Sequence, residues 1–83
     1  MAETLKGKVV VITGAGAGIG LGMAQAFHAA GAWVAMGDLR QDTVERAAAD
    51  LGSERTFAGG VDARDEASVQ NFFAAAELSL IHI

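Results

Sequence analysis

The sequence contains no cysteine, no proline and no tyrosine in its 83 residues. The lack of cysteine excludes a disulfide framework, a thiolate metal site and a cysteine nucleophile. The lack of tyrosine means that no phenol of this chain can supply a proton to a reaction. Basic residues are also few, with six Lys and Arg against ten Asp and Glu, which gives a net charge of −4. This balance argues against nucleic acid as a partner, because there is no basic patch to neutralise phosphates.

One long stretch lacks charge altogether. No Asp, Glu, Lys or Arg occurs in the 29 residues 9–37, and Lys6 and Lys8 precede them. Such a run resembles a signal peptide or a membrane-spanning helix. Seven of these residues are glycine, however, and each glycine would weaken a single helix by about 1 kcal/mol. We therefore expect a soluble, cytoplasmic protein without a membrane segment.

Short apolar runs alternate with helical patterns along the chain, whose length allows one small domain. Residues 8–13, Lys-Val-Val-Val-Ile-Thr, are apolar without alternation, which is typical of a parallel strand buried on both faces. The patterns predict strands at 8–13, 32–37 and 55–61 and helices at 18–30, 42–51 and 65–77. Asp42 and Glu45 form a predicted capping box for the second helix. Strands that alternate with helices of this length indicate an α/β fold with a parallel sheet.

The last six residues depart from this pattern. Leu-Ser-Leu-Ile-His-Ile at 78–83 follows the alanine-rich helix with a strand-like alternation, and it carries no cap, charge or turn residue. The same six residues are encoded by a transposon end that is used as a sequencing adapter. We therefore expect native sequence at residues 1–77 and a tail at 78–83 that is not native.

A glycine cluster joins the first predicted strand to the first predicted helix. Residues 13–20 are Thr-Gly-Ala-Gly-Ala-Gly-Ile-Gly. A phosphate-binding turn needs glycine where the ligand approaches closely, and it needs a helix N-terminus to meet the negative charge. Neither G-x-G-x-x-G nor the Gly-Lys-Ser/Thr of nucleoside triphosphatases occurs. The spacing G-x-x-x-G-x-G fits at Gly14, Gly18 and Gly20 and, on glycines alone, at Gly16, Gly20 and Gly22.

With Thr13 and Ile19 included, residues 5 to about 77 resemble the N-terminal part of the short-chain dehydrogenase/reductase family, whose motif is T-G-x-x-x-G-I-G. Two acidic residues extend the resemblance. Asp38 ends the second predicted strand, 18 residues after Gly20, near the offset of about 20 at which an acidic residue meets the adenosine ribose. Asp62 ends the third predicted strand, where the family has an aspartate that contacts the adenine ring.

The resemblance implies an NAD site at the start of the first helix. Backbone N–H groups of Ile19 and its neighbours would face the pyrophosphate, and Asp38 would accept hydrogen bonds from the ribose hydroxyls. The same carboxylate would repel a 2′-phosphate, so we expect NAD rather than NADP, although the basic Arg40 lies close by. The implied cofactor-binding residues are Thr13, Gly14, Gly18, Ile19, Gly20, Asp38, Leu39, Asp62 and Ala63, and no metal ligand is expected.

Asp62 has a second interpretation, because aspartate often begins a helix. Two residues after this aspartate the family usually has Ser or Thr, and this chain has Arg64. Because Arg64 replaces that Ser or Thr, we expect the capping of the third helix to pass to Asp65.

The catalytic residues of the family lie beyond the matched segment. In the family, an Asn-Asn-Ala-Gly segment is followed by a catalytic serine and then by a Tyr-x-x-x-Lys motif, and this chain contains neither of the two motifs. We therefore predict no catalytic residue and no activity for this chain alone. The resemblance implies a partial Rossmann fold of three layers, with parallel strands in the order 3-2-1 and the second half of the sheet missing, so that residues 1–77 are the NAD-binding half of a domain.

The protein from which such a segment would come is an NAD-dependent oxidoreductase that interconverts an alcohol and a carbonyl by hydride transfer. The resemblance implies a small-molecule substrate, a homo-oligomeric parent protein, and neither nucleic acid nor membrane as a partner. An alternative is a stand-alone dinucleotide-binding module without catalysis.

Overall fold

The computed structural model describes residues 5–52 and 54–80. Three strands alternate with three helices, as the sequence predicts. The elements are β1 (Val9–Thr13), α1 (Gly18–Ala29), β2 (Trp33–Asp38), α2 (Gln41–Leu51), β3 (Thr56–Gly60) and α3 (Glu66–Leu80).

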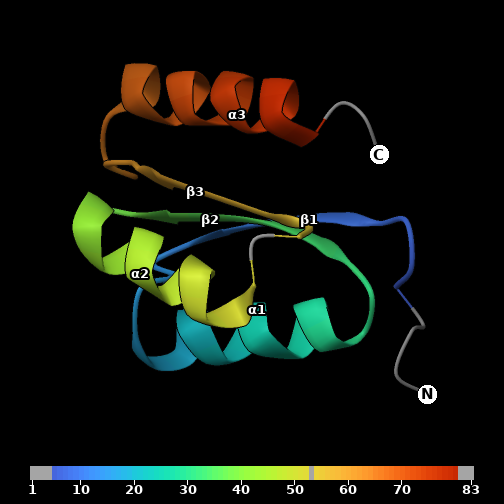
Figure 1. The fold of residues 1–83 in the computed structure, drawn as a ribbon. Coiled ribbons are helices and arrows are strands. Elements are labelled where there is room, and N and C mark those ends of the chain that lie inside the picture. The colour runs from blue at the N-terminus through green and yellow to red at the C-terminus, as the bar shows by residue number, and fades with distance from the viewer. Residues whose placement is uncertain (1–4, 53, 81–83) are drawn as a thin grey trace.

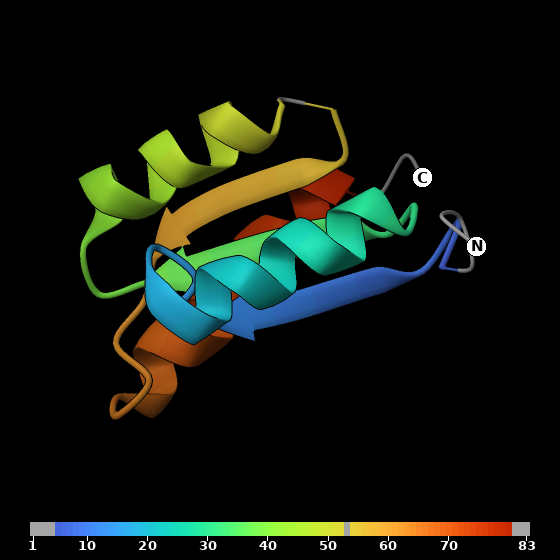
Figure 2. The ribbon, with the colours of Figure 1, turned by 90° about the horizontal axis from the view of Figure 1, so that it is seen from below.

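The three strands form one parallel sheet in the order β1-β2-β3, with β2 in the centre. Val34 of β2 lies opposite Val10 of β1 and Thr56 of β3, so the strands are aligned across the sheet. Figure 1 shows α3 on one face of the sheet and α1 with α2 on the other. In Figure 2, which looks onto that second face, α1 lies toward β1 and α2 toward β3. The α/β class, the three layers and the 3-2-1 order are confirmed.

Two apolar clusters hold these layers together. The larger one lies between the sheet and the helices α1 and α2, and its fully buried side chains include Val34, Met36 and Val44. The smaller one lies under α3 and gathers Ala35, Val61, Phe72, Ala76 and Leu80. Since β2 contributes to both clusters, its residues are apolar without alternation, as expected for a central parallel strand.

The predicted capping box of α2 is wrong. The helix begins at Gln41, because Arg40 is still extended and its carbonyl accepts the first helical hydrogen bond, from the Val44 N–H at 3.1 Å. Asp42 therefore lies inside the first turn, where its carboxylate accepts the N–H of Thr43 at 2.9 Å. No side chain caps this helix.

The predicted end of α3 at residue 77 is also wrong. The helix continues to Leu80, so residues 78–80 are helical and not strand-like. Phe72, Ala76 and Leu80 follow one another at intervals of four, which places them on one helix face, and all three are buried against the sheet. Residues 81–83 of the expected tail lie outside the described residues. That residues 78–83 are not native sequence stays a prediction.

No helix among residues 5–52 and 54–80 is long and apolar enough to cross a membrane.

Candidate functional site

The glycine-rich turn between β1 and α1 folds tightly against the end of the sheet. Gly14 has φ 69°, a left-handed conformation that side chains with a Cβ rarely adopt. The next residue, Ala15, is fully buried and donates its N–H to the Gly37 carbonyl of β2 at 2.9 Å. A Cβ on Gly20 would overlap the Gly14 carbonyl, so the first turn of α1 can pack on the end of β1 only with glycine there. Gly18, at the start of α1, also has a left-handed φ, of 61°, so backbone conformation or close packing accounts for all three glycines of the motif.

The N-terminus of α1 has no side-chain cap. Ala17 is the N-cap residue, no side chain bonds to the first turn, and no acidic residue lies in it. The first N–H groups of a helix have no partner within the helix, and together with the helix dipole they favour an anion. Ile19 exposes 84% of its surface at this end. This end of α1 is therefore chemically suited to a phosphate group.

Asp38 at the end of β2 lies over the same turn. One carboxylate oxygen accepts the Gly16 N–H at 2.9 Å, and the other accepts the Arg40 N–H at 3.2 Å. A Cβ on Gly16 would come within 2.9 Å of the first oxygen, so the absence of a side chain lets the carboxylate approach the turn. Gly16 is not among the site residues predicted from the sequence, although the second glycine spacing, with Gly20 and Gly22, contains it.

Asp62 lies at the same end of the sheet, just beyond β3. The neighbouring Val61 donates its N–H to the Asp38 carbonyl at 2.8 Å, which ties the chain after β3 to the end of β2. The N–H of Asp62 donates to the Ser68 hydroxyl of α3 at 2.9 Å. These bonds fix the backbone of Asp62 between the sheet and α3.

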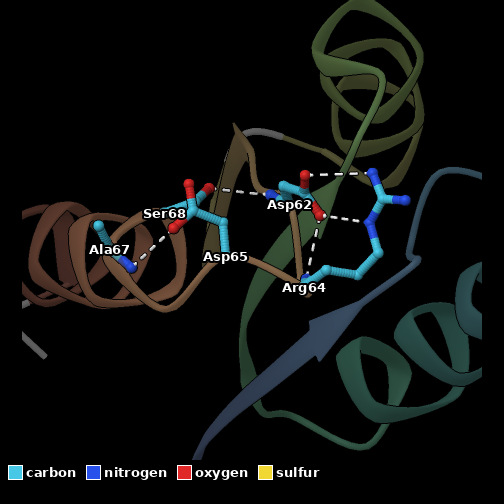
Figure 3. A network of polar contacts seen from close by, with 5 residues as sticks. All are labelled: Asp62, Arg64, Asp65, Ala67 and Ser68. Atoms are coloured by element: carbon cyan, nitrogen blue, oxygen red, sulfur yellow. Dashed lines mark hydrogen bonds and ion pairs between the residues drawn. The ribbon is translucent and has the colours of Figure 1, made fainter.

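Arg64 binds the Asp62 carboxylate in two ways (Figure 3). Its backbone N–H donates to Oδ1 at 3.0 Å, and its guanidinium donates through Nε to Oδ1 at 3.1 Å and through Nη2 to Oδ2 at 3.3 Å. The side-chain bond and then the backbone bond hold the pKa of Asp62 below its ordinary value. The same pair raises the pKa of Arg64, chiefly through the side-chain hydrogen bond.

Asp65, and not Asp62, caps α3. Its carboxylate accepts the Ala67 N–H at 3.1 Å and its carbonyl accepts the Val69 N–H at 3.0 Å, which is N-cap geometry. The capping interpretation of Asp62 is thus wrong, and the Asp62 carboxylate is engaged by Arg64 instead. Arg64 stands where the family usually has Ser or Thr, but its ion pair was not predicted from the sequence.

The predicted residues all lie at the end of the sheet that is formed by the carboxyl ends of its strands. Each of them follows the carboxyl end of β1, β2 or β3, ends such a strand, or opens α1. In open α/β sheets, ligands bind outside the carboxyl ends of the strands. Leu39, 65% exposed, adds an apolar surface beside Asp38. Across the described part of the chain, no three His, Asp or Glu side chains gather in a way that could hold a metal ion.

Comparison with known proteins gives a family match over most of the chain. A family model described as short chain dehydrogenase matches residues 8–83. The meso-2,3-butanediol dehydrogenase of Serratia marcescens is 43% identical over 63 residues, which cover 76% of this chain and 25% of that protein. A short chain dehydrogenase/reductase of Macrophomina phaseolina (strain MS6) is 39% identical over 75 residues, which cover 87% of this chain and 43% of that protein.

Solved structures show the same arrangement. A 3-ketoacyl-(acyl-carrier-protein) reductase from Brucella melitensis, crystallised in complex with NADH, matches with a TM-score of 0.87 and 39% identity, over 92% of this chain and 31% of that one. A second short-chain dehydrogenase/reductase from Brucella melitensis, described as glucose/ribitol dehydrogenase, matches with a TM-score of 0.85 and 35% identity, over 93% of this chain and 33% of that one. The chain therefore spans less than half the length of each of these four relatives.

Proposed function

Because this chain belongs to the short-chain dehydrogenase/reductase family, we propose that it is the N-terminal, cofactor-binding segment of an NAD-dependent oxidoreductase. The longer protein that this proposal implies is called the complete enzyme. Bound NAD would accept or donate a hydride, so that the complete enzyme interconverts an alcohol and a carbonyl. Relatives named as dehydrogenases and as a reductase support this reaction class.

The observation that carries the proposal is the position of Asp38. Its carboxylate lies over the glycine-rich turn, on the N–H of Gly16, beside an α1 N-terminus that no side chain caps. One ligand that combines a phosphate anion with a neighbouring vicinal diol would match both features. A dinucleotide supplies this pair as its pyrophosphate and its adenosine ribose.

The choice of NAD over NADP follows from the same carboxylate. A negative charge at the ribose favours two hydroxyl donors and repels a 2′-phosphate. Arg40 lies two residues further on, but it contacts Asp38 through its backbone N–H, which leaves the carboxylate charge in place. The complex of a related reductase with NADH is in keeping with this choice.

Thr13, Gly14, Gly18, Ile19, Gly20, Asp38, Leu39, Asp62 and Ala63 remain the proposed cofactor-binding residues. The substrate would be a small alcohol or carbonyl compound, bound by parts of the complete enzyme outside this chain. A cytoplasmic location and a homo-oligomeric state stay predictions.

The proposed role of Asp38 is tested by Asp38→Ala in the complete enzyme. Hydrogen bonds to a charged group contribute about 1.5–3 kcal/mol, so we expect the Kd for NADH to rise about 10- to 100-fold. The Kd for NADPH should stay the same or fall, because the repulsion is removed. Isothermal titration calorimetry with both dinucleotides measures the change. Asp50→Ala is the matched control, since Asp50 is exposed on α2 and its loss changes the net charge equally. An unchanged preference for NADH over NADPH would refute the role of Asp38.

The second candidate is a stand-alone dinucleotide-binding module without catalysis. It is consistent with the lack of tyrosine, because without tyrosine this chain has no Tyr-x-x-x-Lys motif of its own. It predicts a stop codon after Ile83 and a folded product of 83 residues that binds NAD. The first proposal predicts that the source DNA reads on from Glu77 into Asn-Asn-Ala-Gly and later into Tyr-x-x-x-Lys. Sequencing this DNA across codons 70 to 100 distinguishes the two.

A further inference from the structure

The carboxylate proposed to contact adenine is already bound by a side chain of its own loop. Both oxygens of Asp62 accept from the Arg64 guanidinium (Figure 3). Nε donates to Oδ1 at 3.1 Å and Nη2 donates to Oδ2 at 3.3 Å. A carboxylate has about four acceptor positions, and Arg64 occupies three of them through its backbone N–H, Nε and Nη2. An adenine amino group must approach the same two oxygens. Arg64 and the adenine ring therefore compete for Asp62.

The two kinds of bond around Asp62 can be separated. The backbone N–H of Arg64, the Ser68 hydroxyl and the Asp65 cap hold the loop in place without the guanidinium. The guanidinium itself contributes only the ion pair with Asp62, and the Arg64 side chain is 84% exposed. A change confined to that side chain should free Oδ2 of Asp62 and leave Oδ1 bonded only to the Arg64 backbone N–H, with the loop geometry unchanged.

We propose that Arg64 is an internal competitor for Asp62, which must release the carboxylate, at least in part, before the adenine amino group can bind it. This inference rests on the proposed NAD site. The ion pair is exposed, and exposed pairs are weak, so a ligand can displace the guanidinium at small cost. The consequence is a lower affinity for adenine dinucleotides than the same site would have with serine at position 64.

The test is Arg64→Ser in the complete enzyme, with NADH and deamino-NADH as paired ligands. Deamino-NADH has hypoxanthine in place of adenine and so has no amino group to donate to Asp62. We expect the Kd for NADH to fall about two- to fivefold, since this is the range that an exposed ion pair provides. The Kd for deamino-NADH should not fall. Fluorescence titration of the nicotinamide measures both ligands.

Two controls isolate the contribution of the ion pair. Arg46→Ser deletes an exposed arginine of α2 and makes the same change in net charge, so it should alter neither Kd. In an Asp62→Asn background, where the acceptor charge is gone, Arg64→Ser should have no further effect on NADH. Circular dichroism of each variant checks that the fold is retained.

Each contrary outcome overturns a specific claim. A weaker affinity for NADH in Arg64→Ser would mean that the guanidinium itself holds the adenine, and equal tightening of both ligands would mean a general charge effect. Either result refutes the competition, as does an unchanged Kd for NADH. A wild-type enzyme that binds neither dinucleotide would instead refute the proposed NAD site.

Discussion

At the scale of the residue, Arg55 combines backbone strain with two hydrogen bonds. It has φ 66°, and no other non-glycine residue in the described ranges has a positive φ. Its Nη1 donates to the carbonyl of His28 at 3.1 Å and to that of Ala32 at 2.7 Å, which ties the start of β3 to the C-terminus of α1. The side chain thus compensates for a backbone conformation that costs about 1–2 kcal/mol outside glycine.

Substitution of Arg55 should separate these two effects. We expect Arg55→Ala to lower the free energy of unfolding of the complete enzyme by about 1–3 kcal/mol. The Ala32 carbonyl would lose the Arg55 donor, and the His28 carbonyl would keep only the Gly31 N–H, at 3.0 Å. Arg55→Gly loses the same bonds but relieves the left-handed strain, so it should be about 1 kcal/mol more stable than the alanine variant. Urea denaturation measures both. Equal stability of the two variants would show that the backbone is not strained at this position.

The lowered pKa of Asp62 predicts that the stability of the fold depends on pH. The Arg64 side chain lowers the pKa of Asp62 in the folded protein relative to its ordinary value. The ion pair with Arg64 therefore stabilises the fold fully at pH values above the unfolded-state pKa of Asp62, about 3.9. This stabilisation is lost as the pH falls through the lower pKa of the folded state. In this acid range, the melting temperature of Arg64→Ser should fall less with decreasing pH than that of the wild type. The melting temperature of Arg46→Ser should fall as much as that of the wild type. An identical acid profile for wild type and Arg64→Ser would contradict the ion pair.

At the scale of the element, the packing of α3 on β2 depends on Gly37. A Cβ at this position would come within 2.6 Å of Val61 Cγ1 and 3.0 Å of Phe72 Cζ. Because Gly37 is buried, these side chains have little room to move. We expect Gly37→Ala to lower the free energy of unfolding by about 1–3 kcal/mol through overpacking.

Gly22 offers a matched control for this substitution. It lies in the middle of α1, and nothing would meet its Cβ within 4 Å. Gly22→Ala should therefore raise the free energy of unfolding by about 0.5–1 kcal/mol through helix propensity. Thermal and urea unfolding of both variants measure the two effects. The same sign of change for both would show that α3 does not pack closely over Gly37.

The elements themselves could be predicted where one physical signal dominates. β1 and β2 are apolar runs without alternation, and the structure places both within a residue of their predicted bounds. The start of α2 was missed because Asp42 and Glu45 match a capping box, while the extended backbone of Arg40 has no local signal in the sequence. The end of α3 was missed because the burial of Leu80 depends on the sheet beneath it, which is a tertiary contact.

The candidate site could also be predicted from the sequence only in part. The glycine spacing and the strand ends predicted the positions of Asp38 and Asp62, because the carboxyl ends of parallel strands lie at the same end of the sheet. The partners of these carboxylates could not be predicted. Gly16 and Arg64 become partners only through the exact path of two loops, and hydrogen bonds from backbone N–H groups leave no pattern of side chains in the sequence.

At the scale of the whole molecule, the sheet is open beside β1. This strand forms one edge of the sheet. The helix α3 lies over β2 and β3, and β1 reaches the cluster beneath α3 through Val11. Val9 is 51% exposed, and its neighbour Val10 packs on the opposite side, toward α1. The described residues thus leave an apolar strand with unpaired backbone groups along its outer edge, which is a typical site of self-association.

We expect the 83-residue chain, expressed alone, to self-associate at micromolar concentration through β1. Val9→Lys should shift it toward monomer, because a charge on an edge strand opposes pairing with another edge. Sedimentation velocity measures the change. Val10→Lys is the contrasting variant, since Val10 is partly buried against the cluster under α1 and a lysine there should lower the free energy of unfolding. In the complete enzyme, where further sequence would cover this edge, Val9→Lys should instead lower stability. A wild-type chain that is folded and monomeric at the same concentration would contradict the exposed-edge argument and favour the stand-alone module.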